Sequence, residues 1–218
     1  MKLIKSNFAG VIAGTPVDTR LGVNFLHSLN YKTHGFAISP SSMEQDLLQK
    51  NSVPELQSLC LSEMKKMESL GVSFIVIYCS SLSSALDIND FRQKLSVPVY
   101  TPLDHYLDIA NKYNRFSVIA ANEIGLAGFE SIVIDQNKKA IISGMFCIDI
   151  VRKIEADINP KVIVNDSDFI GFIRNSESKG CECLVLACTH FEYIRSEVES
   201  LTDMRVIDID SGLSKIIV

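Results

Sequence analysis

Short apolar runs alternate with helix-compatible segments along the first eighty residues of the chain. The apolar runs are predicted strands and cover Phe8 to Ala13, Gly35 to Ser39 and Val72 to Tyr78. A predicted helix from Leu21 to Leu29, with Asp18 or Thr19 as its cap, lies between the first two, and a longer helix begins near Pro54. Alternation of this kind produces parallel strands joined by crossover helices. The sequence therefore predicts an α/β fold.

The second half of the chain repeats this pattern more loosely. Further strands are predicted at Val97 to Tyr100, Phe116 to Ala121, Cys183 to Ala187 and Arg205 to Ile209. Ser131 to Gly144 fits two short strands or a helix with a tail. The doubling predicts two similar domains, each a small, mainly parallel sheet flanked by helices. The first would comprise residues 1–96 plus 196–218, and the second residues 97–195.

Composition excludes several classes of function. The net charge is −5 and no run of basic residues stands out, which argues against a nucleic-acid partner. No apolar stretch reaches the roughly 18 residues that a membrane span needs, and the N-terminus lacks the layout of a signal peptide. The expected location is therefore a reducing cytoplasm, where the six cysteines are free thiols.

Two cysteines lie at the ends of predicted strands, one in each half of the chain. Cys79 ends the apolar run of FIVIYCSSLSSAL, and Cys188 ends that of CLVLACTHFEYI. Hydroxyl residues and a predicted helix follow each of them. A helix N-terminus offers unpaired N–H groups and partial positive charge, which favour a thiolate and can hold a carboxylate. Ligands bind at the carboxyl ends of parallel strands, so two facing domains would place both thiols in one cleft.

Two thiols in one cleft form a two-base arrangement. One thiolate removes a proton from a carbon atom, and the other thiol delivers a proton to the opposite face, which inverts the configuration without a cofactor. The competing interpretation is structural, because a cysteine that ends a buried strand often serves only as a small hydrophobe. For either cysteine alone the structural interpretation comes first, but the paired pattern favours a functional one.

Three motifs together resemble those of the aspartate/glutamate racemase superfamily. CTH after an apolar strand is similar to the second catalytic motif, YCSSLSS to the first, and GVIAGTPVDTRLGV to the opening of aspartate-racemase-like members. The resemblance covers nearly the whole chain. It implies an enzyme independent of pyridoxal phosphate and of any other cofactor or metal, with an active site between two α/β domains. The implied reaction is racemisation of aspartate or glutamate.

The resemblance also assigns roles to individual residues. Cys79 and Cys188 would act as the acid and base, with His190 and, as a looser match, Asp18 assisting proton transfer. The residues expected to contact the amino-acid substrate are Thr15, Ser80, Ser81, Asn122 and Thr189. Asn122 would replace a threonine that the family usually has there. A homodimer is one option for the assembly.

Departures from the family pattern leave the substrate open. Ser80 stands where the family has asparagine, and Glu192 where it has proline. Hydantoin racemisation, maleate isomerisation, racemisation of another amino acid and a non-catalytic ligand-binding protein therefore remain alternatives. Retention of both cysteines counts against an arylmalonate decarboxylase.

The remaining cysteines and histidines receive no catalytic role. The cluster of Cys181, Cys183, Cys188 and His190 lacks the paired C-x-x-C spacing of a zinc site. Cys60 and Cys147 are predicted to be core thiols. The sequence shows no partner for His27, His34 or His105.

Overall fold

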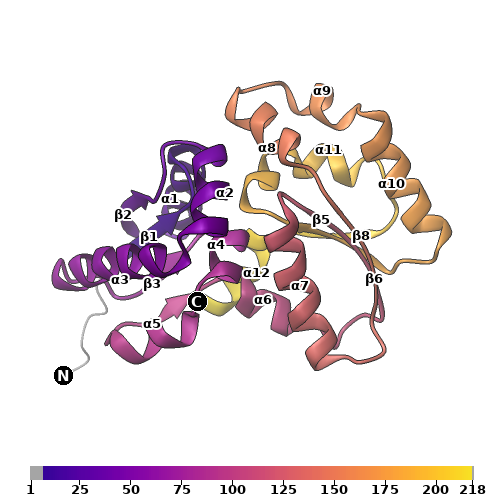
Figure 1. Cartoon of the computed structure of the whole chain (residues 1–218). Coiled ribbons are helices and arrows are strands. Elements are labelled where there is room, and N and C mark those ends of the chain that lie inside the picture. The colour runs from indigo at the N-terminus through magenta and orange to yellow at the C-terminus, as the bar shows by residue number, and fades with distance from the viewer. Residues whose placement is uncertain (1–6, 218) are drawn as a thin grey trace. The chain divides into compact units, whose positions relative to one another are not determined.

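The chain forms two compact units that meet in sequence between Pro102 and Leu103. The computed structural model describes residues 7–217 (Figure 1). None of the helices among these residues has the length and apolar character to cross a membrane. The elements of the first unit are β1 (Phe8–Ala13), α1 (Pro16–Ser28), β2 (Lys32–Ala37), α2 (Ser42–Asn51), α3 (Val53–Ser69), β3 (Ile75–Ile77), α4 (Ser80–Ala85), α5 (Ile88–Lys94) and β4 (Val99–Tyr100).

The first unit is built on a parallel sheet with the strand order β2-β1-β3-β4. β1 is one of its two central strands. On one side Ala13 lies opposite Ala37 of β2, and on the other Ile12 lies opposite Ile77 of β3. The carboxyl ends of β1 and β3 therefore lie side by side at one edge of the sheet.

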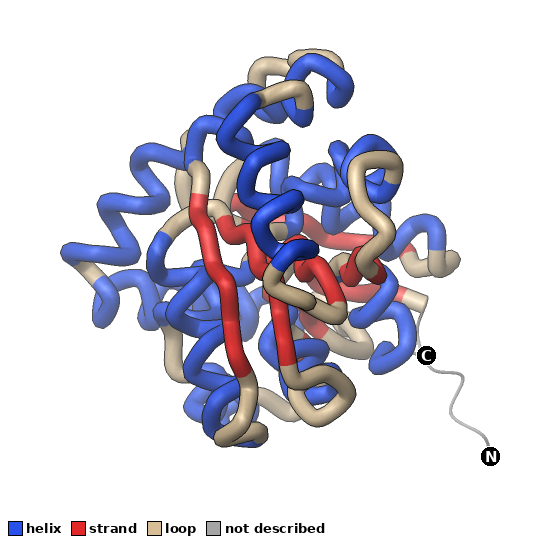
Figure 2. Tube along the Cα trace, turned by 90° about the vertical axis from the view of Figure 1, so that its right-hand side faces the viewer, coloured by secondary structure: helices blue, strands red, loops and turns tan. Residues whose placement is uncertain are grey.

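The second unit repeats this arrangement. Its elements are α6 (Pro102–Ile109), β5 (Arg115–Ala120), α7 (Glu123–Gln136), β6 (Ile141–Phe146), α8 (Ile148–Glu155), α9 (Pro160–Val164), α10 (Ser167–Ser178), β7 (Cys183–Ala187), the 3-10 helix η1 (Thr189–Ile194), α11 (Arg195–Glu199), β8 (Arg205–Ile207) and α12 (Ile209–Ile217). Its sheet is also parallel, with the order β6-β5-β7-β8. Helices flank the strands along the chain (blue and red in Figure 2). The prediction of two parallel α/β units is thus confirmed.

Side chains of the second sheet alternate between two cores. Leu184 and Leu186 of β7 point to the core formed with α8, α9, α10 and the segment after Cys188. Cys183, Val185 and Ala187 of the same strand point to the core formed with α6 and α7. This two-sided burial explains why β7 is apolar throughout, since both faces of a parallel sheet are covered.

The predicted domain boundaries are wrong at two places. β4 pairs with β3, so residues 97–102 belong to the first unit. β8 pairs with β7, with Val185 opposite Ile207, so the last strand completes the second sheet and does not return to the first domain. The reason is that β8 is only three residues long, and its partner is set by main-chain hydrogen bonds that local sequence does not encode.

Local sequence sets most helix boundaries. Thr15 caps α1, because its hydroxyl accepts a hydrogen bond from the Asp18 N–H at 3.2 Å. The helix therefore begins at Pro16, a favoured first position for proline, and not at Leu21 with Asp18 or Thr19 as the cap. The alternatives for residues 131–144 resolve into the end of α7 followed by β6.

Candidate functional site

The first unit gathers predicted site residues where its two central strands end. Thr15 follows β1, and Cys79 follows β3. The adjacent register of these strands places the two positions at the same edge of the sheet. Cys79 has extended backbone angles and serves as the N-cap of α4, so the N–H groups of the first turn begin directly after the thiol. Its side chain is 6% exposed.

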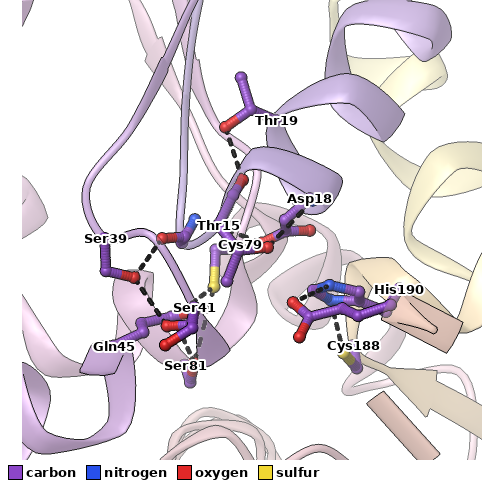
Figure 3. Close-up of polar contacts among 12 residues, drawn as sticks. Thr15, Asp18, Thr19, Ser39, Ser41, Gln45, Cys79, Ser81, Cys188 and His190 are labelled. Atoms are coloured by element: carbon purple, nitrogen blue, oxygen red, sulfur yellow. Dashed lines mark hydrogen bonds and ion pairs between the residues drawn. The ribbon is translucent and has the colours of Figure 1, made fainter. Parts of the chain in front are cut away.

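Two glutamines of α2 contact this group: Gln45 reaches the Cys79 thiol and Ser81 (Figure 3), and Gln49 reaches Ser81. Gln45 Nε2 donates to Cys79 Sγ at 3.2 Å and lies 3.4 Å from Ser81 Oγ. Gln49 Nε2 donates to the same hydroxyl at 3.2 Å, and Ser81 Oγ lies 3.6 Å from Cys79 Sγ. Donors aimed at a sulfur atom stabilise the thiolate over the thiol.

Sequence reasoning missed these glutamines, although both are buried. Gln45 and Gln49 are one helical turn apart on α2, where an amphipathic interpretation assigns polar residues to the solvent side. Gly14 makes the placement of Gln45 possible, because a Cβ at that position would lie 1.9 Å from Gln45 Oε1. The signal in the sequence is a pair of uncharged polar residues at i and i+4 that follows a strand-end loop.

Asp18 is fully buried beside the same strand end. It lies in the first turn of α1, where the helix dipole favours a negative charge. Its carboxylate accepts a hydrogen bond from the Gly14 N–H at 3.3 Å. Ser80 and Ser81 occupy the first turn of α4 and are also buried. The structure thus brings together the first-unit candidates Thr15, Asp18, Cys79, Ser80 and Ser81 around the ends of β1 and β3.

The second unit has a corresponding group at the ends of β5 and β7. Cys188 follows β7 and caps η1, as Cys79 follows β3 and caps α4. Asn122 caps α7 just beyond β5, and its side-chain oxygen accepts a hydrogen bond from Gly125 N at 3.0 Å. β5 and β7 are paired, with Ala120 opposite Ala187, so the two strand ends are adjacent. Cys188 and Thr189 are 7% and 2% exposed.

His190 lies between the Cys188 thiol and a carboxylate (Figure 3). Its Nδ1 atom is 3.8 Å from Cys188 Sγ, and its Nε2 atom is 3.4 Å from Glu155 Oε1. The His190 side chain is 5% exposed. A thiol, an imidazole and a carboxylate in this order can move a proton and stabilise the imidazolium that forms. Glu155 ends α8, 35 residues before His190, and no pattern in the sequence signals its role.

Glu192, the residue that departs from the family motif, is an electrostatic outlier. Burial, followed by the charges of Asp208 and Asp210, raises the pKa of its carboxyl to about 7. Arg195 opposes this change, with its Nη1 atom 3.7 Å from Glu192 Oε1. The same guanidinium lies 3.0 Å from Asp208 Oδ2, so one arginine serves several carboxylates. The result is a protonatable carboxyl in η1, close in sequence to the second cysteine.

Two of the remaining cysteines, Cys60 and Cys183, are fully buried. This burial has a consequence for their ionisation. It raises the pKa of Cys60 and that of Cys183 to about 12, so these thiols stay protonated near neutral pH. The prediction that Cys60 is a core thiol is confirmed. The same prediction for Cys147 is wrong, because this residue is partly exposed at the end of β6. Cys147 caps α8, which makes it a third cysteine at a strand end.

A protein-family profile and several known proteins are similar to this chain. The profile of the Asp/Glu/Hydantoin racemase family matches residues 36–210. The glutamate racemase of Picosynechococcus sp. is 27% identical over 150 residues, which cover 66% of this chain. The chain spans about half of that relative, 52% of its length.

Solved structures show the same fold. The glutamate racemase of Francisella tularensis, crystallised in complex with D-glutamate, superposes with a TM-score of 0.74 at 17% identity and covers 98% of this chain and 80% of its own. An aspartate racemase homologue from Pyrococcus horikoshii superposes with a TM-score of 0.67 at 14% identity and covers 94% and 95%. Since the family profile spans most of the sequence and both units, the chain belongs to the Asp/Glu/Hydantoin racemase family.

Proposed function

We propose that this protein is a cofactor-independent amino-acid racemase that acts on aspartate or glutamate, with Cys79 and Cys188 as its two bases. The observation that carries the proposal is their equivalence. Each thiol follows the third strand in its sheet order, β3 in β2-β1-β3-β4 and β7 in β6-β5-β7-β8, and each caps the helical segment that follows. The proposal assigns one thiol to each face of the substrate's Cα.

The proposed reaction balances in protons. One cysteine, as the thiolate, removes the Cα proton, and the other, as the thiol, donates a proton to the opposite face of the carbanion. The enzyme ends the turnover with the protonation states of the two cysteines exchanged. Gln45 stabilises the Cys79 thiolate through its N–H at 3.2 Å. His190, paired with Glu155, supplies or receives a proton on the Cys188 side. The chemistry needs free thiols, so the proposal includes a reducing compartment, the cytoplasm.

The substrate's carboxylate and amine are assigned to small polar side chains at the strand ends. Buried hydroxyls are available at Thr15, Ser80, Ser81 and Thr189. In the proposal they bind the α-carboxylate and α-amine together with the first-turn N–H groups, and Asp18 assists proton transfer. Ser80 and Glu192 depart from the family pattern, so the preference between aspartate and glutamate is measured by comparing exchange rates for the two amino acids.

The test is α-proton exchange in D2O, followed by NMR, over a panel of D- and L-amino acids, hydantoins and maleate. Cys79→Ser and Cys188→Ser should each lower racemisation by at least about a thousandfold. Each single variant should still exchange the α-proton of one enantiomer, because one base remains. Cys147→Ser is the matched control, since this cysteine also ends a strand and caps a helix. Full racemase activity in either site variant would refute the two-base assignment, and no exchange with any substrate would favour a binding protein.

A further inference from the structure

A charged hollow lies on the second unit, along the edge strand β8 and between α6 and α12. Its volume is about 130 Å³. Among the residues that line it are four cations, Lys112, Arg195, Arg205 and Lys215, and two carboxylates, Asp108 and Asp208. The lining is therefore net positive in a chain whose net charge is −5. Such a concentration of cations in an acidic protein indicates a site for an anion.

The two carboxylates are already held by two of the cations. Lys112 Nζ lies 2.7 Å from Asp108 Oδ2, and Arg195 Nη1 lies 3.0 Å from Asp208 Oδ2. Asp208 Oδ1 also accepts a hydrogen bond from the Ser211 N–H at 2.7 Å. Asp108 thus neutralises Lys112, and Arg195 is shared among Asp208, Glu199 and Glu192, so neither cation has charge to spare for a ligand.

The other two cations are not held in such pairs, although the charge of Lys215 contributes to lowering the pKa of Asp108. Within residues 7–217, neither Arg205 nor Lys215 forms an ion pair with another side chain. Both line the same hollow, one from the start of β8 and the other from α12. Two positive charges therefore remain available to a ligand.

His105 supplies an unsatisfied group to the hollow. Its side chain is only 3% exposed and lines the hollow, yet neither ring nitrogen has a hydrogen-bond partner among the described residues. Burial lowers the pKa of the imidazole, so the ring is neutral and keeps one N–H donor. A buried donor without an acceptor costs about 1–3 kcal/mol. Gly212 packs closely against the ring, because a Cβ there would lie 2.1 Å from it.

We propose that this hollow binds a phosphate group. A phosphate dianion brings enough oxygen atoms and charge for Arg205, Lys215 and the His105 N–H together. A carboxylate carries one charge and two oxygens, and would leave part of this lining unsatisfied. The hollow accommodates the phosphate group, and the organic part of a phosphate monoester would lie outside it. Free phosphate and a phosphate monoester share this chemistry and are separated by the experiment.

Isothermal titration calorimetry of the full chain with inorganic phosphate, AMP and succinate tests the proposal. Arg205→Ala and Lys215→Ala should each weaken phosphate binding about tenfold, as expected for the loss of one charge-assisted hydrogen bond. The double variant should be weaker than either. Arg174→Ala, which removes an exposed cation from α10, is the control and should leave binding unchanged. Circular dichroism confirms that all variants are folded.

The relative affinities for AMP, inorganic phosphate and succinate distinguish the possible outcomes. Tighter binding of AMP than of phosphate identifies a monoester as the ligand, and equal binding identifies free phosphate. Phosphate should also shift the ¹⁵N resonances of the His105 ring, which a surface ion atmosphere would not do. Equal affinity for succinate, equal affinity in the double variant and the Arg174 control, or no binding below about 10 mM would overturn the proposal. The variants leave Cys79 and Cys188 untouched, so failure here does not bear on racemisation.

Discussion

Glu192→Gln tests the electrostatics of η1 directly. Burial and the charges of Asp208 and Asp210 raise the pKa of Glu192 from 4.5 to about 7. Between pH 4.5 and about pH 7, the folded protein therefore binds more protons at this carboxyl than the unfolded chain does. Its contribution to stability is complete below the unfolded pKa and is lost as the pH rises through about 7. Above pH 7 the ionised carboxylate destabilises the folded state.

The size of the effect follows from that interval and from solvent exposure. The rise in the Glu192 pKa from 4.5 to about 7 would correspond to about 3 kcal/mol of folding free energy for a fully buried group. The Glu192 side chain is 35% exposed, and solvent screening reduces the figure to about 1–2 kcal/mol. Glutamine keeps the shape without the charge. Arg195 loses one partner but retains Asp208 at 3.0 Å and Glu199 at 2.9 Å. The substitution should therefore raise the free energy of unfolding at pH 8 by about 1–2 kcal/mol and change it little at pH 5.

Urea unfolding followed by circular dichroism at pH 5 and pH 8 measures this difference. Glu197→Gln is the matched control, since Glu197 lies on the adjoining α11 and forms no ion pair with another described residue. Its effect should be small and similar at both pH values. If Glu192→Gln shifted stability equally at pH 5 and pH 8, or lowered it at pH 8, the assigned protonation behaviour would be wrong.

Three further expectations concern packing and thiol chemistry. Gly22→Ala should lower the free energy of unfolding by about 1–3 kcal/mol, because its Cβ would lie 2.8 Å from the ring of the tyrosine that follows β3. Gly171→Ala, whose Cβ would meet no atom within 4 Å, should raise it by about 0.5–1 kcal/mol, and thermal denaturation compares the two. Gln45→Leu removes the donor to the first thiol and should slow racemisation at least about tenfold; an unchanged rate in a coupled assay would contradict its role. Cys60, whose pKa burial raises to about 12, should resist iodoacetamide at pH 8, and mass spectrometry would reveal any labelling that contradicts this.

The positions of the candidate thiols were predictable because they depend on local pattern. A buried parallel strand is a short apolar run, and the residue after it lies at the sheet edge where ligands bind. Cys79 and Cys188 could be placed there from spacing alone, and the structure puts both at N-caps. The cap of α1 was less predictable, because Thr15, Asp18 and Thr19 all have side chains that can cap a helix.

The partners of these thiols were not predictable. Gln45 contacts Cys79 across 34 residues of sequence, and Glu155 reaches His190 across 35. Such contacts depend on how α2 and α8 pack on their sheets, and a polar residue on a helix gives no indication of which side it will face. His105 is the same case, because sequence showed no partner for it and the structure shows a buried ring that lines a cationic hollow.

Local patterns in the sequence specify the α/β class, the doubling of the chain and the two strand-end cysteines, because strands, helices and caps are set by residues close together. Tertiary packing sets which sheet β8 joins and which amides and carboxylates surround each thiol, and it raises the pKa of Glu192 to about 7. Hydrogen bonds and burial between distant segments set these features, and they have no local signature.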